Sequence, residues 1–204
     1  MKILEQTLIL KGSIFIFQLD LKKDYLQFFK NFKYTGTGDD HYPSKISKNL
    51  NILNNKNFKE MNLEINKCFK YVINNIYEYD CNFFITKSWA TKTEQTQYSM
   101  SHRHSNSWLS AVYYPDFDPA FIIEFYNDVH STFVTIPKNY NIYNSTQWKF
   151  TPKKNSLIIF PSELRHKILM NKSQKTRYSL SLNVLPQGIF GYKDTEVFFK
   201  YNTC

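Results

Sequence analysis

The chain has 204 residues, of which 42% are hydrophobic and 18% aromatic, while only five are glycine. This composition excludes a disordered or low-complexity chain, and the length suits a single domain with a sizeable core. The net charge of +9 favours a polyanionic partner, but the lysines are scattered and accompany abundant Asn, Ile, Phe and Tyr, as codon bias in an AT-rich genome produces.

Cysteine usage and hydropathy indicate a compartment. Three irregularly spaced cysteines, Cys68, Cys81 and Cys204, do not form a disulfide framework, so we expect a reducing cytoplasm, that of the host if the protein is viral. The N-terminal run to Leu19 is interrupted by Glu5 and favours strands over a secretion signal. Since no apolar run approaches about 20 residues, we expect no membrane span.

The segment up to Asp80 predicts mostly helical structure after one or two strands over Leu8–Leu19. The aromatic spacing predicts a helix from Asp20, as its N-cap, to Phe32. A longer apolar stripe over Asn49–Tyr79, with a break near Asn54, predicts a helix that packs on the outside of a sheet.

After Asp80 the pattern changes to short segments rich in aromatic and β-branched residues, at roughly ten-residue spacing. This pattern predicts a β-sandwich or barrel. We therefore expect one domain over residues 1–204, with an N-terminal support (1–80) and a β core (81–190). The expected strands are Phe83–Ala90, Thr96–His104, Trp108–Tyr114, Phe121–Tyr126, Phe133–Ile136, Gln147–Thr151, Leu157–Phe160, Arg165–Met170 and Arg177–Leu185.

Three histidines form the candidate metal site. His102 and His104 are two residues apart in a predicted strand, so both side chains lie on one face. His166, at the start of another predicted strand, can supply a third imidazole. Three such ligands occupy one face of a divalent metal and leave the opposite positions open, which suits non-haem iron, although zinc accepts the same ligands.

The strand that begins at Arg177 carries a candidate anion site. Alternation places Arg177, Ser179, Ser181 and Asn183 on one face, and apolar or aromatic side chains on the other. A polar face inside a small barrel indicates a bound polar ligand. The planar guanidinium can bind a carboxylate through two hydrogen bonds, and the Ser179 hydroxyl adds a donor. The alternative is a surface arginine that follows the turn at 172–175.

These motifs resemble a known family. The segments SHRHSNSWLSAVYYP (101–115), SLIIFPSELRHKI (156–168) and KTRYSLSLNV (175–184) are similar to the iron(II)- and 2-oxoglutarate-dependent oxygenases, and most similar to a small subfamily of marine phages and bacteria. The resemblance covers about Trp89 to Val184. It implies an α+β, mainly β fold, the double-stranded β-helix or cupin-like jelly roll, with the N-terminal helices packed on the outer sheet.

The resemblance also implies the chemistry. Fe(II) would be held at His102 and His166, and 2-oxoglutarate at Arg177 and Ser179, with Tyr98 a further candidate for the cofactor pocket. The implied activity is that of a dioxygenase that consumes O2 and 2-oxoglutarate, releases succinate and CO2, and hydroxylates an unidentified substrate, which could be a small molecule, a peptide or a nucleic acid. The sequence does not predict the oligomeric state.

The position of His104 leaves alternatives, because the wider superfamily has a carboxylate there. His104 can complete a three-histidine site, or support a two-histidine site from outside. Alternatively, Glu124 or Asp128 can supply the carboxylate, although we favour an exposed strand charge for Glu124. His41 and His130 are expected to be loop residues without a role in the site.

Two other functions stay open. A cupin-type metalloenzyme would use the three histidines without 2-oxoglutarate. A basic, non-catalytic module would bind nucleic acid through its net positive charge.

Overall fold

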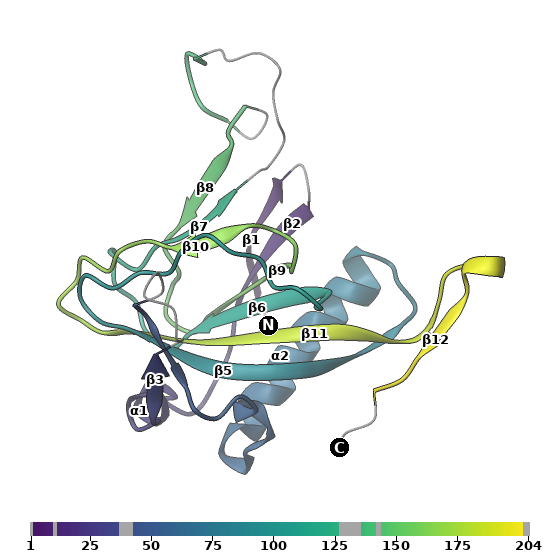
Figure 1. Ribbon diagram of the computed structural model, residues 1–204, viewed down its shortest axis with the longest axis horizontal. Helices are drawn as coiled ribbons and strands as arrows, with labels where there is room; N and C mark the ends of the chain where they lie inside the picture. Colours follow the sequence, from purple (N-terminus) through teal and green to yellow (C-terminus); the bar gives the residue numbers. More distant parts are fainter. Residues whose placement is uncertain (1, 10–11, 37–42, 127–135, 142–143, 202–204) are drawn as a thin grey trace.

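The computed structural model describes residues 2–9, 12–36, 43–126, 136–141 and 144–201, with the backbone alone for residues 2–9. Figure 1 shows the course of the chain. The strands are β1 (Lys2–Ile9), β2 (Gly12–Gln18), β3 (Tyr34–Gly36), β4 (Lys45–Ser47), β5 (Asn82–Thr93), β6 (Leu109–Tyr114), β7 (Ile123–Tyr126), β8 (Gln147–Phe150), β9 (Ser156–Pro161), β10 (His166–Ile168), β11 (Arg177–Phe190) and β12 (Val197–Phe199). The helices are α1 (Leu26–Lys30), α2 (Lys59–Tyr71), the 3-10 turns η1 (Ile52–Asn54), η2 (Lys56–Phe58) and η4 (Lys193–Thr195), and the π-helical turn η3 (Val72–Ile76).

The described strands form two antiparallel sheets (Figure 1). The larger sheet has the order β1-β2-β9-β6-β11-β5-β4-β3, and β12 pairs with the far end of β11. The smaller sheet has the order β10-β7-β8. This mainly β, two-sheet architecture confirms the predicted fold class.

Side-chain alternation in the larger sheet creates two cores, one on each face. In β9, Leu157 and Ile159 point to the helical layer, while Ile158 and Phe160 point to the smaller sheet. Helix α2 covers the outer face through Met61, Ile65, Cys68 and Phe69, all fully buried. The prediction of a helix on the outside of a sheet is therefore confirmed, and the inner face remains available for a site.

The segment before β5 is less helical than expected, because β1 to β4 all belong to the larger sheet. The helix predicted from Asp20 to Phe32 is reduced to α1. Glu60 of α2 accepts a hydrogen bond from the backbone N–H of Lys22 at 2.8 Å. This bond connects the segment that precedes α1 to α2, so the N–H of Lys22 is not used in a helical turn. Among the described residues, no helix is long and apolar enough to cross a membrane.

Candidate functional site

Three imidazoles meet between the two sheets. His102, His104 and His166 each offer a ring nitrogen, and these nitrogens all lie within 4.8 Å of one another. This separation is close to the span of about 4.2 Å that two metal–nitrogen bonds of about 2.1 Å can bridge. The three predicted ligands therefore lie where one divalent ion could contact them all.

The backbone that carries the histidine pair is not the regular strand predicted over Thr96–His104. Thr96 has a positive φ of 68°, and the segment runs beside residues 162–171 with a single bridge, His102 to His166. The N–H of each of these two histidines donates to the carbonyl of the other, at 2.9 and 3.0 Å. These two hydrogen bonds place candidate ligands from two distant segments side by side, although the segments are not paired as continuous β-strands.

Hydrogen bonds at Nδ1 fix how each ring is turned. His102 Nδ1 lies 2.8 Å from the carbonyl oxygen of Met100, and His166 Nδ1 lies 2.9 Å from that of Leu164. Because a carbonyl oxygen only accepts, these Nδ1 atoms carry the proton and the lone pair is on Nε2. That tautomer is the one metal-binding imidazoles adopt when an outer acceptor orients them.

His104 is oriented by a polar cluster instead of a carbonyl group. Its Nδ1 lies 2.6 Å from Asn183 Oδ1 and 3.0 Å from the hydroxyl of Ser110, which also donates to Asn183 Oδ1. Ser110 in turn shares a hydrogen bond of 2.8 Å with Ser162. Sequence analysis missed the two serines, although Ser110 is three residues before the aromatic pair of the matched motif.

All three imidazoles are held neutral by burial. Desolvation lowers the pKa of His102 and His104, and lowers that of His166 well below 6.5, with added repulsion from the other two rings. Neutral imidazole is the form that binds a metal ion. The site is therefore available to a cation at neutral pH.

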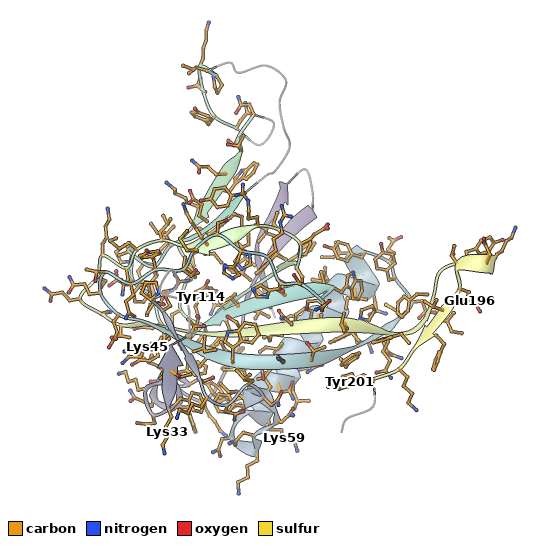
Figure 2. The ribbon with its side chains drawn as sticks, in the orientation of Figure 1. Lys33, Lys45, Lys59, Tyr114, Glu196 and Tyr201 are labelled. Carbon is orange, nitrogen blue, oxygen red and sulfur yellow. The ribbon has the colours of Figure 1, made fainter. Side chains whose placement is uncertain are left out.

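A cavity of about 390 Å³ joins these histidines to Arg177. Arg177 is only 2% exposed, and its guanidinium donates to the hydroxyl of Tyr114 at 2.9 Å and to the carbonyl of Ile122 at 3.3 Å. Tyr114 belongs to the apolar cluster between the two sheets, and Figure 2 labels it left of centre, in the same half of the picture as Lys45. Within the described chain, Arg177 Nε has no hydrogen-bond partner and no acidic side chain lines the cavity. A buried cation in that state favours an anionic ligand.

The polar face predicted for the Arg177 strand does face the site. Ser179 and Ser181 line the same cavity as Arg177, and Asn183 contacts His104. Leu180 and Leu182 lie in the helical core on the other side of the sheet. The alternative of a surface arginine is excluded by its burial.

The placement of Tyr98 differs from the expectation. It lines a separate groove with Met100 and Met170, while its neighbour Ser99 lines the histidine cavity. The carbonyl of Tyr98 accepts hydrogen bonds from the backbone and hydroxyl of Ser44, which is a cavity residue. Tyr98 thus supports the cavity wall through its backbone, and it lines the adjoining groove instead of the histidine cavity.

Glu124 does not reach the histidines. Its neighbour Ile123 lines the cavity, so the carboxylate projects from the opposite face of β7. It is buried, not exposed as expected, and it pairs with Lys167 at 3.1 Å and accepts from Tyr126 at 2.7 Å. Asp128, His130 and His41 lie outside the described residues.

Comparisons with known proteins agree with this geometry. Residues 87–183 match the protein-family model described as "Putative 2OG-Fe(II) oxygenase". A search of curated proteins gave no match.

Solved structures share the fold at low sequence identity. SnoN, a non-heme alpha ketoglutarate dependent epimerase from nogalamycin biosynthesis, is 10% identical with a TM-score of 0.64, over 84% of this chain and 76% of that one. A prolyl hydroxylase from Trichoplax adhaerens is 13% identical with a TM-score of 0.61, over 84% and 82%. HygX from Streptomyces hygroscopicus, solved with nickel, 2-oxoglutarate and hygromycin B, is 7% identical with a TM-score of 0.59, over 84% and 82%.

The two-sheet arrangement is thus the double-stranded β-helix of solved 2-oxoglutarate oxygenases. The family match covers the histidine pair, His166 and the part of β11 from Arg177 to Asn183. Residues 87–183 of this chain, close to half of it, thus match the 2OG-Fe(II) oxygenase family, whose cofactors are iron and 2-oxoglutarate.

Proposed function

We propose that this protein is an Fe(II)- and 2-oxoglutarate-dependent dioxygenase that hydroxylates its substrate, with residues 1–204 as one oxygenase domain. In this proposal His102, His104 and His166 hold the iron, and Arg177 with Ser179 holds the distal carboxylate of 2-oxoglutarate. The observation that carries it is a buried guanidinium without an acidic partner among the described residues, in the same cavity as three converging imidazoles.

The donor set supports an iron site with three histidine ligands. Each Nδ1 has an acceptor within 3.0 Å, so each ring can present Nε2 to a metal in a fixed orientation. Since Glu124 points away and no acidic side chain of the described residues lines the cavity, His104 is the best candidate for the third ligand. Three neutral ligands leave the full charge of the cation to attract an anionic co-substrate.

Arg177 supports the 2-oxoglutarate site in a complementary way. Its two hydrogen bonds to Tyr114 and Ile122 hold the guanidinium in place, while the buried Nε has no partner within the described chain. Tyr114 also lies under the guanidinium, with 5.0 Å from the Arg177 Cζ to the ring centroid. The bound iron and 2-oxoglutarate supply the oxidising chemistry, with succinate and CO2 as co-products, and the chain supplies orientation and a dry pocket.

The substrate side of the cavity is formed by residues of β4 and β5. Trp89 lies next to His104, with 5.8 Å between ring centroids, and Ile46 and Thr91 line the same wall. Solved structures of this fold include a prolyl hydroxylase and an epimerase, so the fold alone does not select the reaction. Hydroxylation is proposed from the resemblance of the motifs, and product analysis decides it.

The first experiment measures succinate formed from 2-oxoglutarate by the purified protein with Fe(II), ascorbate and O2, with and without candidate substrates. We expect slow turnover without substrate, abolished by His166→Ala. Arg177→Met should abolish co-substrate binding, whereas a cupin-type enzyme that does not use 2-oxoglutarate would keep its activity.

Two outcomes would overturn the proposal. One is wild-type protein that binds neither metal nor 2-oxoglutarate. The other is tight, steeply salt-dependent binding of DNA or RNA that persists in His102→Ala without any turnover, as expected of a non-catalytic module.

A further inference from the structure

The far end of β11 forms an arm that the oxygenase site does not use. Beyond Gln187, where its pairing with β5 ends, β11 continues to Phe190, turns, and returns as β12, so that residues 188–201 project from the body (Figure 1). We call this segment the C-terminal arm. Figure 2 labels Glu196 near its tip and Tyr201 near its base.

The turn of the C-terminal arm requires a glycine. Gly191 has a φ of +90°, and a Cβ at this position would lie 2.1 Å from the carbonyl oxygen of Thr195. Only glycine fits such a position. Tyr192 and Thr195 close the turn with a hydrogen bond of 3.0 Å from the Tyr192 N–H to the Thr195 hydroxyl. At the base, Tyr201 stacks on Phe84 of β5 at 4.3 Å. These contacts define the C-terminal arm as a β-hairpin with its own turn and base.

This hairpin exposes apolar side chains that a lone ribbon cannot cover. Ile189 lies directly opposite Phe198, and the two are 64% and 70% exposed. Tyr192 is 73% exposed, and Val197 is also exposed. Among the described strands, β12 pairs only with β11, so its other edge is open. Two-stranded ribbons are marginally stable in water, and open apolar edges are usually covered.

We propose that the C-terminal arm is a dimerisation surface that packs against a second copy of this chain. Its charge supports this occupant. The arm carries Lys193, Asp194, Glu196 and Lys200, a net charge of zero in a chain of net charge +9. Two basic copies can approach at this neutral surface with little repulsion, whereas a nucleic acid would find no excess of cations on it.

A groove at the base of the arm offers the matching surface. It has a volume of about 430 Å³. One side is lined by residues 79–81 and Trp108 of the body, and the other by residues of β11 and the following turn, among them Ile189. Because the arm and the groove belong to the same chain, a two-fold axis lets each copy insert its arm beside the groove of the other. The contact then closes on itself, as in most homodimers.

The available area is compatible with a stable dimer. With about 200 Å² for an aromatic side chain, the exposed parts of the arm's apolar side chains amount to roughly 600 Å². Specific interfaces bury about 800 Å² on each partner. The apolar side chains of the arm alone therefore provide most of one partner's share of such an interface.

Light scattering coupled to gel filtration tests the proposal on the full chain. The wild type should elute with twice the 24.4 kDa mass of one chain. Phe198→Asp should give a single chain with unchanged binding of Co(II). Ile189→Ser provides a second, milder variant in case the charge prevents folding. Leu63→Asp is the matched control, because Leu63 is 56% exposed on α2, away from the arm, and should leave the dimer intact.

Hydrogen exchange gives an independent readout. Diluting the wild type through its dissociation range should expose the amides of β12 and leave those of β6 protected. A wild type that remains a single chain at micromolar concentration overturns the proposal. The partner of the arm would then be a different macromolecule. A dimer that persists in both Phe198→Asp and Ile189→Ser, or that protects amides elsewhere, also overturns it.

Discussion

Replacement of Arg177 by methionine separates the stability of the protein from its affinity for 2-oxoglutarate. In a structural role, a buried arginine contributes stability through paired contacts, and its removal is strongly destabilising. Arg177 has instead an unpartnered Nε and two hydrogen bonds, one of them long at 3.3 Å. We therefore expect Arg177→Met to change the stability of the ligand-free protein only slightly, while 2-oxoglutarate loses its main anchor.

The magnitudes follow from the contacts. Methionine removes an unsatisfied buried donor that costs about 1–3 kcal/mol, and it gives up two hydrogen bonds of about 1 kcal/mol each and a cation–π contact with Tyr114 of about 0.5–2 kcal/mol. At their midpoints these terms leave a net loss of only about 1 kcal/mol, so the melting temperature without ligand should fall by about 2–5 °C. Loss of a buried charge pair with a carboxylate costs about 2–5 kcal/mol, an affinity loss on the order of 30- to 5,000-fold.

Thermal unfolding with Mn(II) present, with and without 2-oxoglutarate, measures both quantities. At about 100 times its Kd, 2-oxoglutarate should stabilise the wild type by about 2.7 kcal/mol, a rise of about 5–11 °C. Arg177→Met should rise by no more than about 3 °C at that concentration, whereas Lys45→Met, which removes a half-exposed cation near the cavity, should behave as wild type. An equal rise in Arg177→Met and wild type would refute the assignment of the anion site.

Three other perturbations test the histidine cluster. Asn183→Leu removes the acceptor that orients His104 and should weaken Co(II) binding by about 10- to 100-fold in calorimetry; unchanged affinity would mean that the amide does not orient the ring. His104→Ala should weaken Co(II) binding at least as much, and a full-affinity variant would instead indicate a two-histidine site. Burial lowers the histidine pKa values below 6.5, so the unfolded metal-free chain binds protons that the folded chain does not. The free energy of unfolding in urea should then be constant above pH 6.5 and fall below it, and His166→Leu should reduce this fall; a pH-independent wild type would contradict the buried neutral rings.

Local patterns predicted much of the site. Alternation along β11 correctly separated the cavity face of Arg177 and Ser179 from the helical core of Leu180, because the sheet is buried on both sides and each face has its own chemistry. The spacing of His102 and His104 also predicted that both rings lie on the same side. The two rings do converge, although the segment that carries them is not a strand. There the ring orientation comes from hydrogen bonds to Met100 and Asn183 instead of from a pleat.

The misplaced features depend on contacts between distant parts of the chain. Residues 97–101 do not form a regular strand, so side-chain alternation does not hold between Tyr98 and His102, and Ser99 lines the histidine cavity. Glu124 was expected to be exposed, but the pairing of β7 with β10 brings Lys167 beside it and permits its burial. The strands that precede α2 were underestimated because β2 pairs with β9, whose position the local sequence does not indicate.

A crystal structure of the protein grown anaerobically with Fe(II) and 2-oxoglutarate tests the central claim most directly. We predict one metal ion bonded at about 2.1 Å to a ring nitrogen of each of His102, His104 and His166, with a carboxylate of 2-oxoglutarate on the guanidinium of Arg177. A metal bound elsewhere, or 2-oxoglutarate that leaves Arg177 without an anionic partner, would contradict the account.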